Sequence, residues 1–277
     1  LPGRRFDEMS AMDREVEALS IDEQREALSS ALMADDAAFA LWALVDSGLA
    51  DTIVPELPAL RLEQDPIHRH KDVLSHTIAV TAKTPPDLRL RLAALFHDIG
   101  KPRTRSFDHG GVTFRHHEAV GAKMTKRRLR ALDFPNDVVA DVAELVRLSG
   151  RFKGYADGWG DAAVRRYARD AGHLLGHLNS LVRSDCTTRN ERKRIELHHH
   201  VDELERRITE LAEADRRRAE RPLLDGDAVM QRLGLEPGPD VGAAMKFLLA
   251  LKRAEPDLDL PATEERLDGW WAERNAS

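Results

Sequence analysis

The feature that most constrains this chain is the apolar stretch at residues 88–101, which ends in two polar residues. Its composition favours a helix, and Gly100 followed by Pro102 predicts the carboxyl end. The apolar stripe of this helix consists of Leu88, Leu92, Leu95 and Phe96. In the last turn, where more leucines would be buried, the chain carries His97 and Asp98. A buried carboxylate is costly unless it is paired or binds a cation. The pair is therefore either a hydrogen-bonded core feature or part of a metal site.

Length and composition exclude several classes of protein. The chain has 277 residues, enough for one large or two ordinary domains, and a net charge of −6. Its longest apolar runs, such as residues 247–251, are too short to span a bilayer, and no secretory signal is visible. The single cysteine, Cys186, excludes an internal disulfide and indicates a reducing, cytoplasmic compartment. Because the net charge is negative, nucleic-acid binding would require a local basic face.

Apolar residues at helical spacing occur along most of the chain, and strand patterns are nearly absent. We therefore expect an all-α fold with a helical amino-terminal segment at 1–64, a central multi-helix domain at 65–198 and a helical tail at 199–277. Ser20-Ile-Asp-Glu23 predicts a capping box at the start of a helix. Residues 103–115 predict a loop or a small hairpin.

The carboxyl-terminal part is rich in charge. Residues 189–218 predict a long helix with one buried stripe, formed by Ile195, Leu204, Ile208 and Leu211. The histidine run at 198–200 is expected to face solvent. After Pro222 we expect two short helices, separated by the glycines and prolines between 234 and 242.

Four candidate ligands lie on apolar helices: His76, His97, Asp98 and Asp185. Two imidazoles and two carboxylates suit Mg, Mn, Fe, Co, Ni or Zn. A divalent cation held in this way lowers the pKa of water and orients a phosphate oxygen, as phosphoester hydrolysis requires. Each residue also has a plain alternative. His76 would serve equally as a hydrogen-bonded core histidine, and Asp185 as a helix-end residue or a partner of Arg189.

The order of these motifs resembles the HD phosphohydrolase superfamily. A wider likeness is to the HD-bearing half of bacterial, actinobacterial-type CCA-adding tRNA nucleotidyltransferases and poly(A) polymerases, and it extends over about residues 20–250. The motifs that carry it are Leu57-Pro-Ala-Leu60, His68-Arg-His-Lys-Asp72, Ser75-His-Thr77, Leu92-Ala-Ala-Leu-Phe-His-Asp-Ile-Gly-Lys-Pro102, Phe114-Arg-His-His-Glu118, Asp185-Cys-Thr-Thr-Arg-Asn190, and the tail segments Pro222–Gly226 and Pro237–Gly242.

The resemblance implies a role for several residues. His76, His97, Asp98 and Asp185 would hold the metal, with His70 and Asp72 as possible supporting groups behind the ligands. His117 would be an accessory active-site histidine near the substrate phosphate. Lys101 would stabilise phosphate charge, or else be a solvated cation at a helix end. Because Ser149 stands where many HD proteins have a further histidine, one metal is expected rather than two.

The resemblance also implies an activity. We expect a metal-dependent phosphohydrolase acting on a 2′-phosphate or 2′,3′-cyclic phosphate of a nucleotide or RNA, in which Asp98, His117 and Lys101 carry the catalysis. One alternative is a non-catalytic tRNA-binding body, and another is a stand-alone nucleotide hydrolase. The nucleotidyltransferase head of that family, with its Gly-Ser loop and Asp-x-Asp pair, has no counterpart here, so this chain is not expected to add nucleotides. The sequence leaves the oligomeric state open.

Three basic clusters are candidate contacts to tRNA. They comprise Lys123, Lys126, Arg127, Arg128 and Arg130; Arg165, Arg166 and Arg169; and Arg189, Arg192, Lys193 and Arg194. Tyr155, Trp159 and Tyr167 lie between the first and third clusters and are candidates for stacking on bases. Each cluster is equally a solvated helix face.

Overall fold

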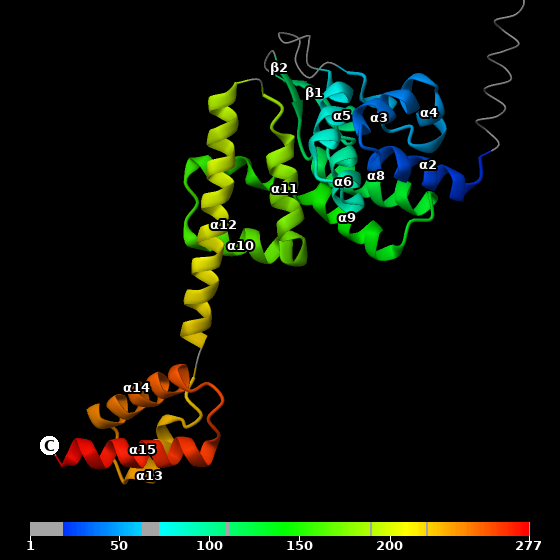
Figure 1. The fold of residues 1–277 in the computed structure, drawn as a ribbon. Helices are drawn as coiled ribbons and strands as arrows, with labels where there is room; N and C mark the ends of the chain where they lie inside the picture. Colours follow the sequence, from blue (N-terminus) through cyan, green and yellow to red (C-terminus); the bar gives the residue numbers. More distant parts are fainter. Residues whose placement is uncertain (1–18, 63–71, 109–110, 189, 220, 277) are drawn as a thin grey trace, which may run out of the picture. The chain divides into compact units, whose positions relative to one another are not determined.

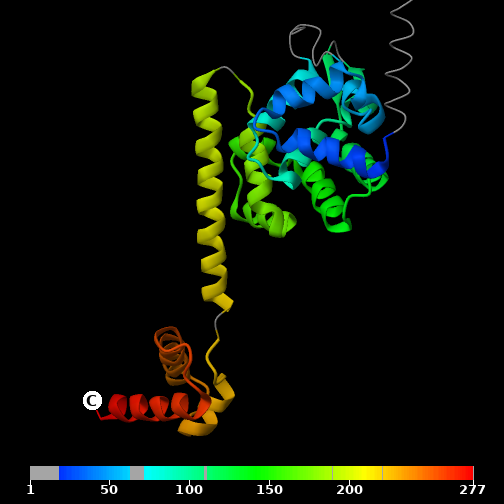
Figure 2. The same ribbon diagram turned by 45° about the vertical axis from the view of Figure 1, so that its right-hand side comes forward.

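The computed structural model describes residues 19–62, 72–108, 111–188, 190–219 and 221–276. The chain forms two compact units, residues 1–208 and 209–277. The division falls inside helix α12 (Glu191–Ala219), ten residues beyond the expected start of the tail at residue 199. The all-α prediction is confirmed, since the described elements are helical apart from one hairpin (Figures 1 and 2). None of the described helices is long and apolar enough to cross a membrane.

The described part of the first unit starts with three helices and a 3₁₀ turn and continues with the helices that carry the candidate ligands. Its described elements before α12 are α2 (Ile21–Met33), α3 (Ala37–Asp46), α4 (Leu49–Ile53), η1 (Pro58–Leu60), α5 (Val73–Lys83), α6 (Leu88–Phe96), α7 (Lys101–Thr104), β1 (Arg105–Asp108), β2 (Gly111–Phe114), α8 (His117–Ala131), α9 (Asn136–Leu148), η2 (Arg151–Asp157), α10 (Asp161–Ala171), η3 (Gly172–Leu174) and α11 (Leu175–Asp185).

Local signals in the sequence define several boundaries of these elements. The capping box at the start of α2 is present: the Ser20 backbone N–H donates to Glu23, and the Glu23 N–H donates to the Ser20 hydroxyl. Strands β1 and β2 form the predicted hairpin, antiparallel, with Arg105 opposite Phe114 and Phe107 opposite Val112.

Helix α6 is the centre of the first unit, where it packs against α2, α5, α9 and α11 (Figure 1). It is buried on all sides rather than along one stripe, since every residue from Leu90 to Gly100 is buried. Even Arg91 is buried, because its guanidinium donates to the carbonyls of Leu32, Ala34 and Thr84. A helix end surrounded in this way places His97 and Asp98 inside the protein.

Helix α8 departs from one expectation. Lys123, Lys126, Arg127 and Arg130 are exposed, as predicted, but Arg128 is not part of that face. Its guanidinium makes two hydrogen bonds, of 2.8 and 3.2 Å, to the buried carboxylate of Glu56. A buried carboxylate needs such a partner, so Arg128 connects α8 to the amino-terminal helices.

The stripe predicted for α12 is only partly correct. Leu204 is buried together with Val201, but Ile195 is 60% exposed. In the second unit, three helices follow α12 instead of two: α13 (Gly226–Leu233), α14 (Pro239–Ala254) and α15 (Leu260–Asn275). Gly242 lies within α14, because Pro239 already begins that helix. The small core of this unit consists of Leu224, Val229, Ala244, Leu248 and Leu267.

Candidate metal centre

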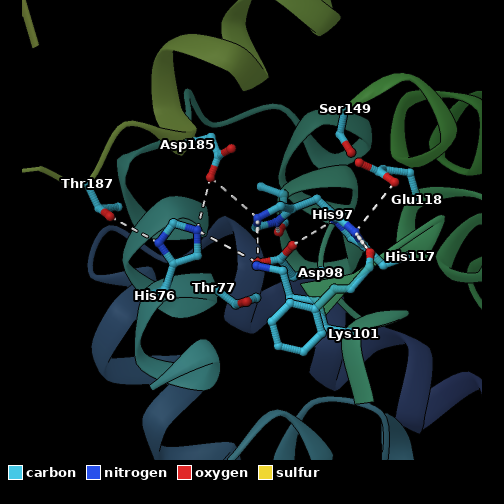
Figure 3. Close-up of polar contacts among 12 residues, drawn as sticks. His76, Thr77, His97, Asp98, Lys101, His117, Glu118, Ser149, Asp185 and Thr187 are labelled. Carbon is cyan, nitrogen blue, oxygen red and sulfur yellow. Dashed lines mark hydrogen bonds and ion pairs between the residues drawn. The ribbon is translucent and has the colours of Figure 1, made fainter. Parts of the chain in front are cut away.

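The candidate ligands come together at the ends of several helices (Figure 3). His76 lies in the first half of α5, and His97 and Asp98 follow the last turn of α6. Asp185 is the last residue of α11, and His117 is the first residue of α8. Residues separated by more than a hundred positions in the sequence therefore share one site.

Ligand atoms of His76, His97 and Asp98 lie within 4.8 Å of one another. His97 Nε2 is 3.3 Å from Asp98 Oδ2, and His76 Nε2 is 3.9 Å from the same oxygen. Asp185 Oδ1 lies 3.0 Å from His76 Nε2 and 3.5 Å from His97 Nε2. Two nitrogens and two oxygens therefore converge on one small volume.

The hydrogen bonding of His97 identifies which ring nitrogen faces this volume. His97 Nδ1 is 2.6 Å from the carbonyl oxygen of Ala94, and a carbonyl can only accept. Nδ1 therefore carries the proton. In the neutral ring, Nε2 then presents a lone pair toward the carboxylates of Asp98 and Asp185. This Nε2 is buried and has no hydrogen-bond partner. A lone pair facing two carboxylates requires a positive charge between them.

The electrostatics of the site lead to the same requirement. Burial opposes protonation of His97, but Asp98 and Asp185 outweigh it and raise the pKa of His97 to about 10. Burial also opposes ionisation of Asp98, yet His97 and Lys101 hold the pKa of that carboxyl below its usual range. Burial likewise opposes ionisation of Asp185, and the nearby imidazoles of His76 and His97 lower its pKa. The carboxylates are therefore ionised and demand a cation, which either a proton on His97 or a metal supplies.

The donor set fits a divalent metal. Metal-bound histidines usually donate their second N–H to a carbonyl or carboxylate, as His97 does to Ala94. Oxygen and imidazole donors without thiolates are typical of sites for Mn, Fe, Co, Ni, Zn or Mg. The residues that would hold the ion are His76, His97, Asp98 and Asp185, and a catalytic metal keeps a further coordination position for water or a substrate oxygen.

Lys101 and His117 also lie beside Asp98, Lys101 at the oxygen that faces His97 and His117 at the other oxygen. Lys101 Nζ is 2.6 Å from Asp98 Oδ2 and lies over the ring of Phe114. Lys101 is therefore a half-buried partner of Asp98 rather than a freely solvated cation. His117 Nδ1 donates to the Phe114 carbonyl at 2.7 Å, which leaves its Nε2 lone pair 3.6 Å from Asp98 Oδ1. Burial lowers the pKa of His117, so this ring is neutral at pH 7.

Helix α5 holds the Asp185 segment at two further points that the sequence analysis missed. His76 Nδ1 is 3.0 Å from Thr187 Oγ1 (Figure 3). Two turns further along α5, Lys83 Nζ donates to the carbonyls of Cys186 and Arg183, at 2.8 and 3.3 Å. A threonine two residues after Asp185 carries no sequence signal, because its role depends on contact with a distant helix.

We expect Thr187→Val to weaken metal binding about 10-fold, because loss of a group behind a ligand usually costs 10- to 100-fold in affinity. Valine keeps the shape of threonine but cannot fix the His76 ring. Thr187→Ser retains the hydroxyl and should restore affinity to within about 2-fold of the wild type. Isothermal titration with Mn²⁺ measures both variants, and equal affinities for valine and serine would contradict the prediction.

Other predicted site residues lie elsewhere. Asp72 is the N-cap of α5, where it accepts from the Ser75 N–H at 3.0 Å. Ser149 donates to the Val146 carbonyl at the end of α9. His70 and Arg189 lie outside the described residues, so neither the supporting role of His70 nor a pairing of Asp185 with Arg189 has a structural account.

The aromatic residues suggested for stacking are mostly internal. Tyr155 and Tyr167 are buried, and the Tyr167 hydroxyl donates to Asn179. Stacking of RNA bases on these two rings was therefore a wrong expectation, since both rings are buried. Trp159 is half-buried. Arg166 is exposed and Arg165 is half-buried on α10.

Comparison with known proteins shows the family of the domain that carries the site. The HD domain family model matches residues 73–231, a range that contains all the candidate ligands. The chain is 35% identical over 259 residues to the A-adding tRNA nucleotidyltransferase of Deinococcus radiodurans, covering 90% of this chain and 58% of the relative. It is 36% identical over 246 residues to the CC-adding tRNA nucleotidyltransferase of Thermus thermophilus, covering 84% of this chain and 53% of the relative. The chain thus spans little more than half the length of these curated relatives. Because the HD domain family model matches more than half of its residues, this chain belongs to the HD domain family.

Proposed function

We propose that this chain is a divalent-metal-dependent phosphohydrolase that acts on a 2′-phosphate or 2′,3′-cyclic phosphate of a nucleotide or RNA in the cytoplasm. The observation that carries this proposal is the buried His97 Nε2, which has no hydrogen-bond partner and faces the carboxylates of Asp98 and Asp185. The names of the relatives, both tRNA nucleotidyltransferases, support an RNA end as the substrate.

A divalent metal supplies a Lewis acid that lowers the pKa of water and orients a phosphate oxygen. Asp98 would help to hold the metal and to deprotonate the attacking water. His117 would assist the leaving group by passing a proton to the leaving oxygen through Nε2, since its Nδ1 is committed to the Phe114 carbonyl. Lys101 reaches the site from the side of Asp98, where its ammonium offsets negative charge on the substrate phosphate.

Asp98→Asn tests this assignment. We expect hydrolysis of 2′,3′-cyclic AMP to fall at least about 100-fold, because the amide binds metal poorly and accepts no proton. The assay should be run with each of Mg, Mn, Fe, Co, Ni and Zn. Asp137→Asn, which alters an exposed carboxylate paired with Arg89, is the matched control and should keep wild-type activity. Equal activity of the wild type and Asp98→Asn with every metal would refute the hydrolase.

A second candidate is a tRNA-binding body in which the HD site is not catalytic. A row of exposed basic residues along one face of α8 favours this tRNA-binding body. The row consists of Lys123, Lys126, Arg127 and Arg130. Such a row follows a phosphate backbone and gives salt-dependent binding. If Asp98→Asn retains tRNA affinity while the wild type hydrolyses no phosphoester, the binding body is favoured. A stand-alone nucleotide hydrolase would hydrolyse the small substrate without binding tRNA.

A further inference from the structure

We propose that a small pocket between η2 and α10 binds one unpaired RNA nucleotide, with its base on Trp159 and its phosphate at Arg166. This inference extends the proposed action on RNA to a second, separate contact on the first unit. The pocket has a volume of about 200 Å³ and is lined by Arg151, Trp159, Ala163, Arg166 and Tyr167. That is smaller than the roughly 300–1,000 Å³ of pockets for whole ligands. It suits a single ring system.

The indole of Trp159 is held in place. Its ring centroid lies 5.4 Å from that of Tyr155 and 5.5 Å from that of Tyr167, both buried. Arg207 of α12 donates to the Trp159 carbonyl at 2.8 Å and so fixes the backbone there. A half-buried indole backed by two rings loses little entropy when a base stacks on its remaining surface.

The segment that lines the pocket carries a net positive charge. Residues 151–171 contain five basic and three acidic residues, in a chain whose net charge is −6. Arg151 is fixed at one side by an ion pair of 2.6 Å with Asp170. Arg166 is exposed at the other side, and no ion pair with another described residue occupies its guanidinium. An aromatic platform next to an available guanidinium is the combination found in single-stranded RNA sites.

Helix α10 offers a matched control for Arg166. Arg169 is also exposed, lies one turn further along the helix, does not line the pocket, and makes only a long ion pair of 3.5 Å with Asp170. Replacing either arginine with glutamine removes the same charge from nearly the same place. A difference between the two variants therefore reports the pocket rather than general electrostatic attraction.

Binding of a short, unpaired, fluorescein-labelled RNA, measured by anisotropy at several salt concentrations, tests the proposal. Trp159→Leu should weaken the RNA Kd about 10-fold and Arg166→Gln about 5-fold, while Arg169→Gln should change it less than 2-fold. Trp159→Phe keeps an aromatic surface and should retain most of the affinity. Thermal melts establish that each variant is folded.

Equal effects of Arg166→Gln and Arg169→Gln would overturn the pocket, as would the absence of RNA binding by the wild type at low salt. Hydrolysis of 2′,3′-cyclic AMP by the same variants separates this proposal from the proposed function. If Trp159→Leu hydrolyses the substrate at the wild-type rate and also binds RNA with unchanged affinity, the proposed RNA pocket is refuted and the proposed hydrolase is not. If the wild type does not hydrolyse the substrate, the proposed hydrolase is refuted, and the proposed RNA pocket is unaffected.

Discussion

Replacing His97 with alanine is expected to remove metal binding while leaving the helices folded. His97 contributes the one site nitrogen that is buried and unpartnered, and its loss also leaves Asp98 and Asp185 without the group that faces both. Affinity should fall by more than the 10- to 100-fold typical of groups behind a ligand. We expect a loss of at least about 100-fold.

The fold should survive because the change removes one ring from a much larger core. Truncation of a buried side chain of this size costs about 2–4 kcal/mol, against roughly 5–15 kcal/mol for a typical domain. Far-UV circular dichroism should therefore show wild-type helicity. Metal analysis after dialysis against Mn²⁺ measures the ion content directly.

Thermal unfolding provides a readout that does not depend on activity. A ligand that binds only the folded state raises the melting temperature, so Mn²⁺ should stabilise the wild type and leave His97→Ala unchanged. His173→Ala is a matched control, since His173 pairs with Asp141 at 2.9 Å in an exposed position away from the site. Wild-type metal content in His97→Ala would contradict the assignment of this nitrogen as a ligand.

The sequence predicted the elements of the site better than its supporting contacts. Helical periodicity predicted helix α6, but α6 ends at Phe96, earlier than the predicted end at Gly100, and Pro102 lies in α7. The placement of His76 and Asp185 on apolar helices predicted that their side chains would be directed inward. Such patterns are local, so they can be detected without the fold. They also led to the correct all-α class.

Contacts between distant elements could not be predicted in this way. The pairing of Arg128 with Glu56 joins residues 72 positions apart, and the contact of His76 with Thr187 joins residues 111 apart. Nothing in a helical pattern distinguishes Arg128 from the exposed Arg127 beside it. The exposure of Ile195 has the same origin, because an apolar residue is buried only where another element covers it.

Gly100→Ala is the second change with a large expected effect, on stability. A Cβ atom at this position would lie 2.1 Å from the carbonyl oxygen of His117 and 2.8 Å from the amide nitrogen of Gly121. Both are backbone atoms of the first turns of α8, so no side-chain rotation can relieve the clash. The whole start of α8 would have to move away from the turn that carries Asp98.

Overpacking of this kind typically costs 1–3 kcal/mol, and a clash with backbone lies at the upper end. We expect Gly100→Ala to lower the free energy of unfolding by about 3 kcal/mol, measured by urea denaturation. Because His117 is the first residue of α8, the same shift should move its ring away from Asp98. Hydrolysis at saturating metal should then fall even where the protein remains folded.

Gly176→Ala separates steric contact from the general effect of replacing a glycine. Gly176 lies in α11, and an added Cβ there meets nothing within 4 Å. Alanine is favoured over glycine in a helix by about 0.5–1 kcal/mol, so this variant should be as stable as the wild type or more so. If Gly100→Ala lowers the free energy of unfolding by less than 1 kcal/mol, the start of α8 does not lie tightly against the turn that carries Asp98. His117 would then have no fixed position beside Asp98, and its assigned role in proton transfer would fail with it.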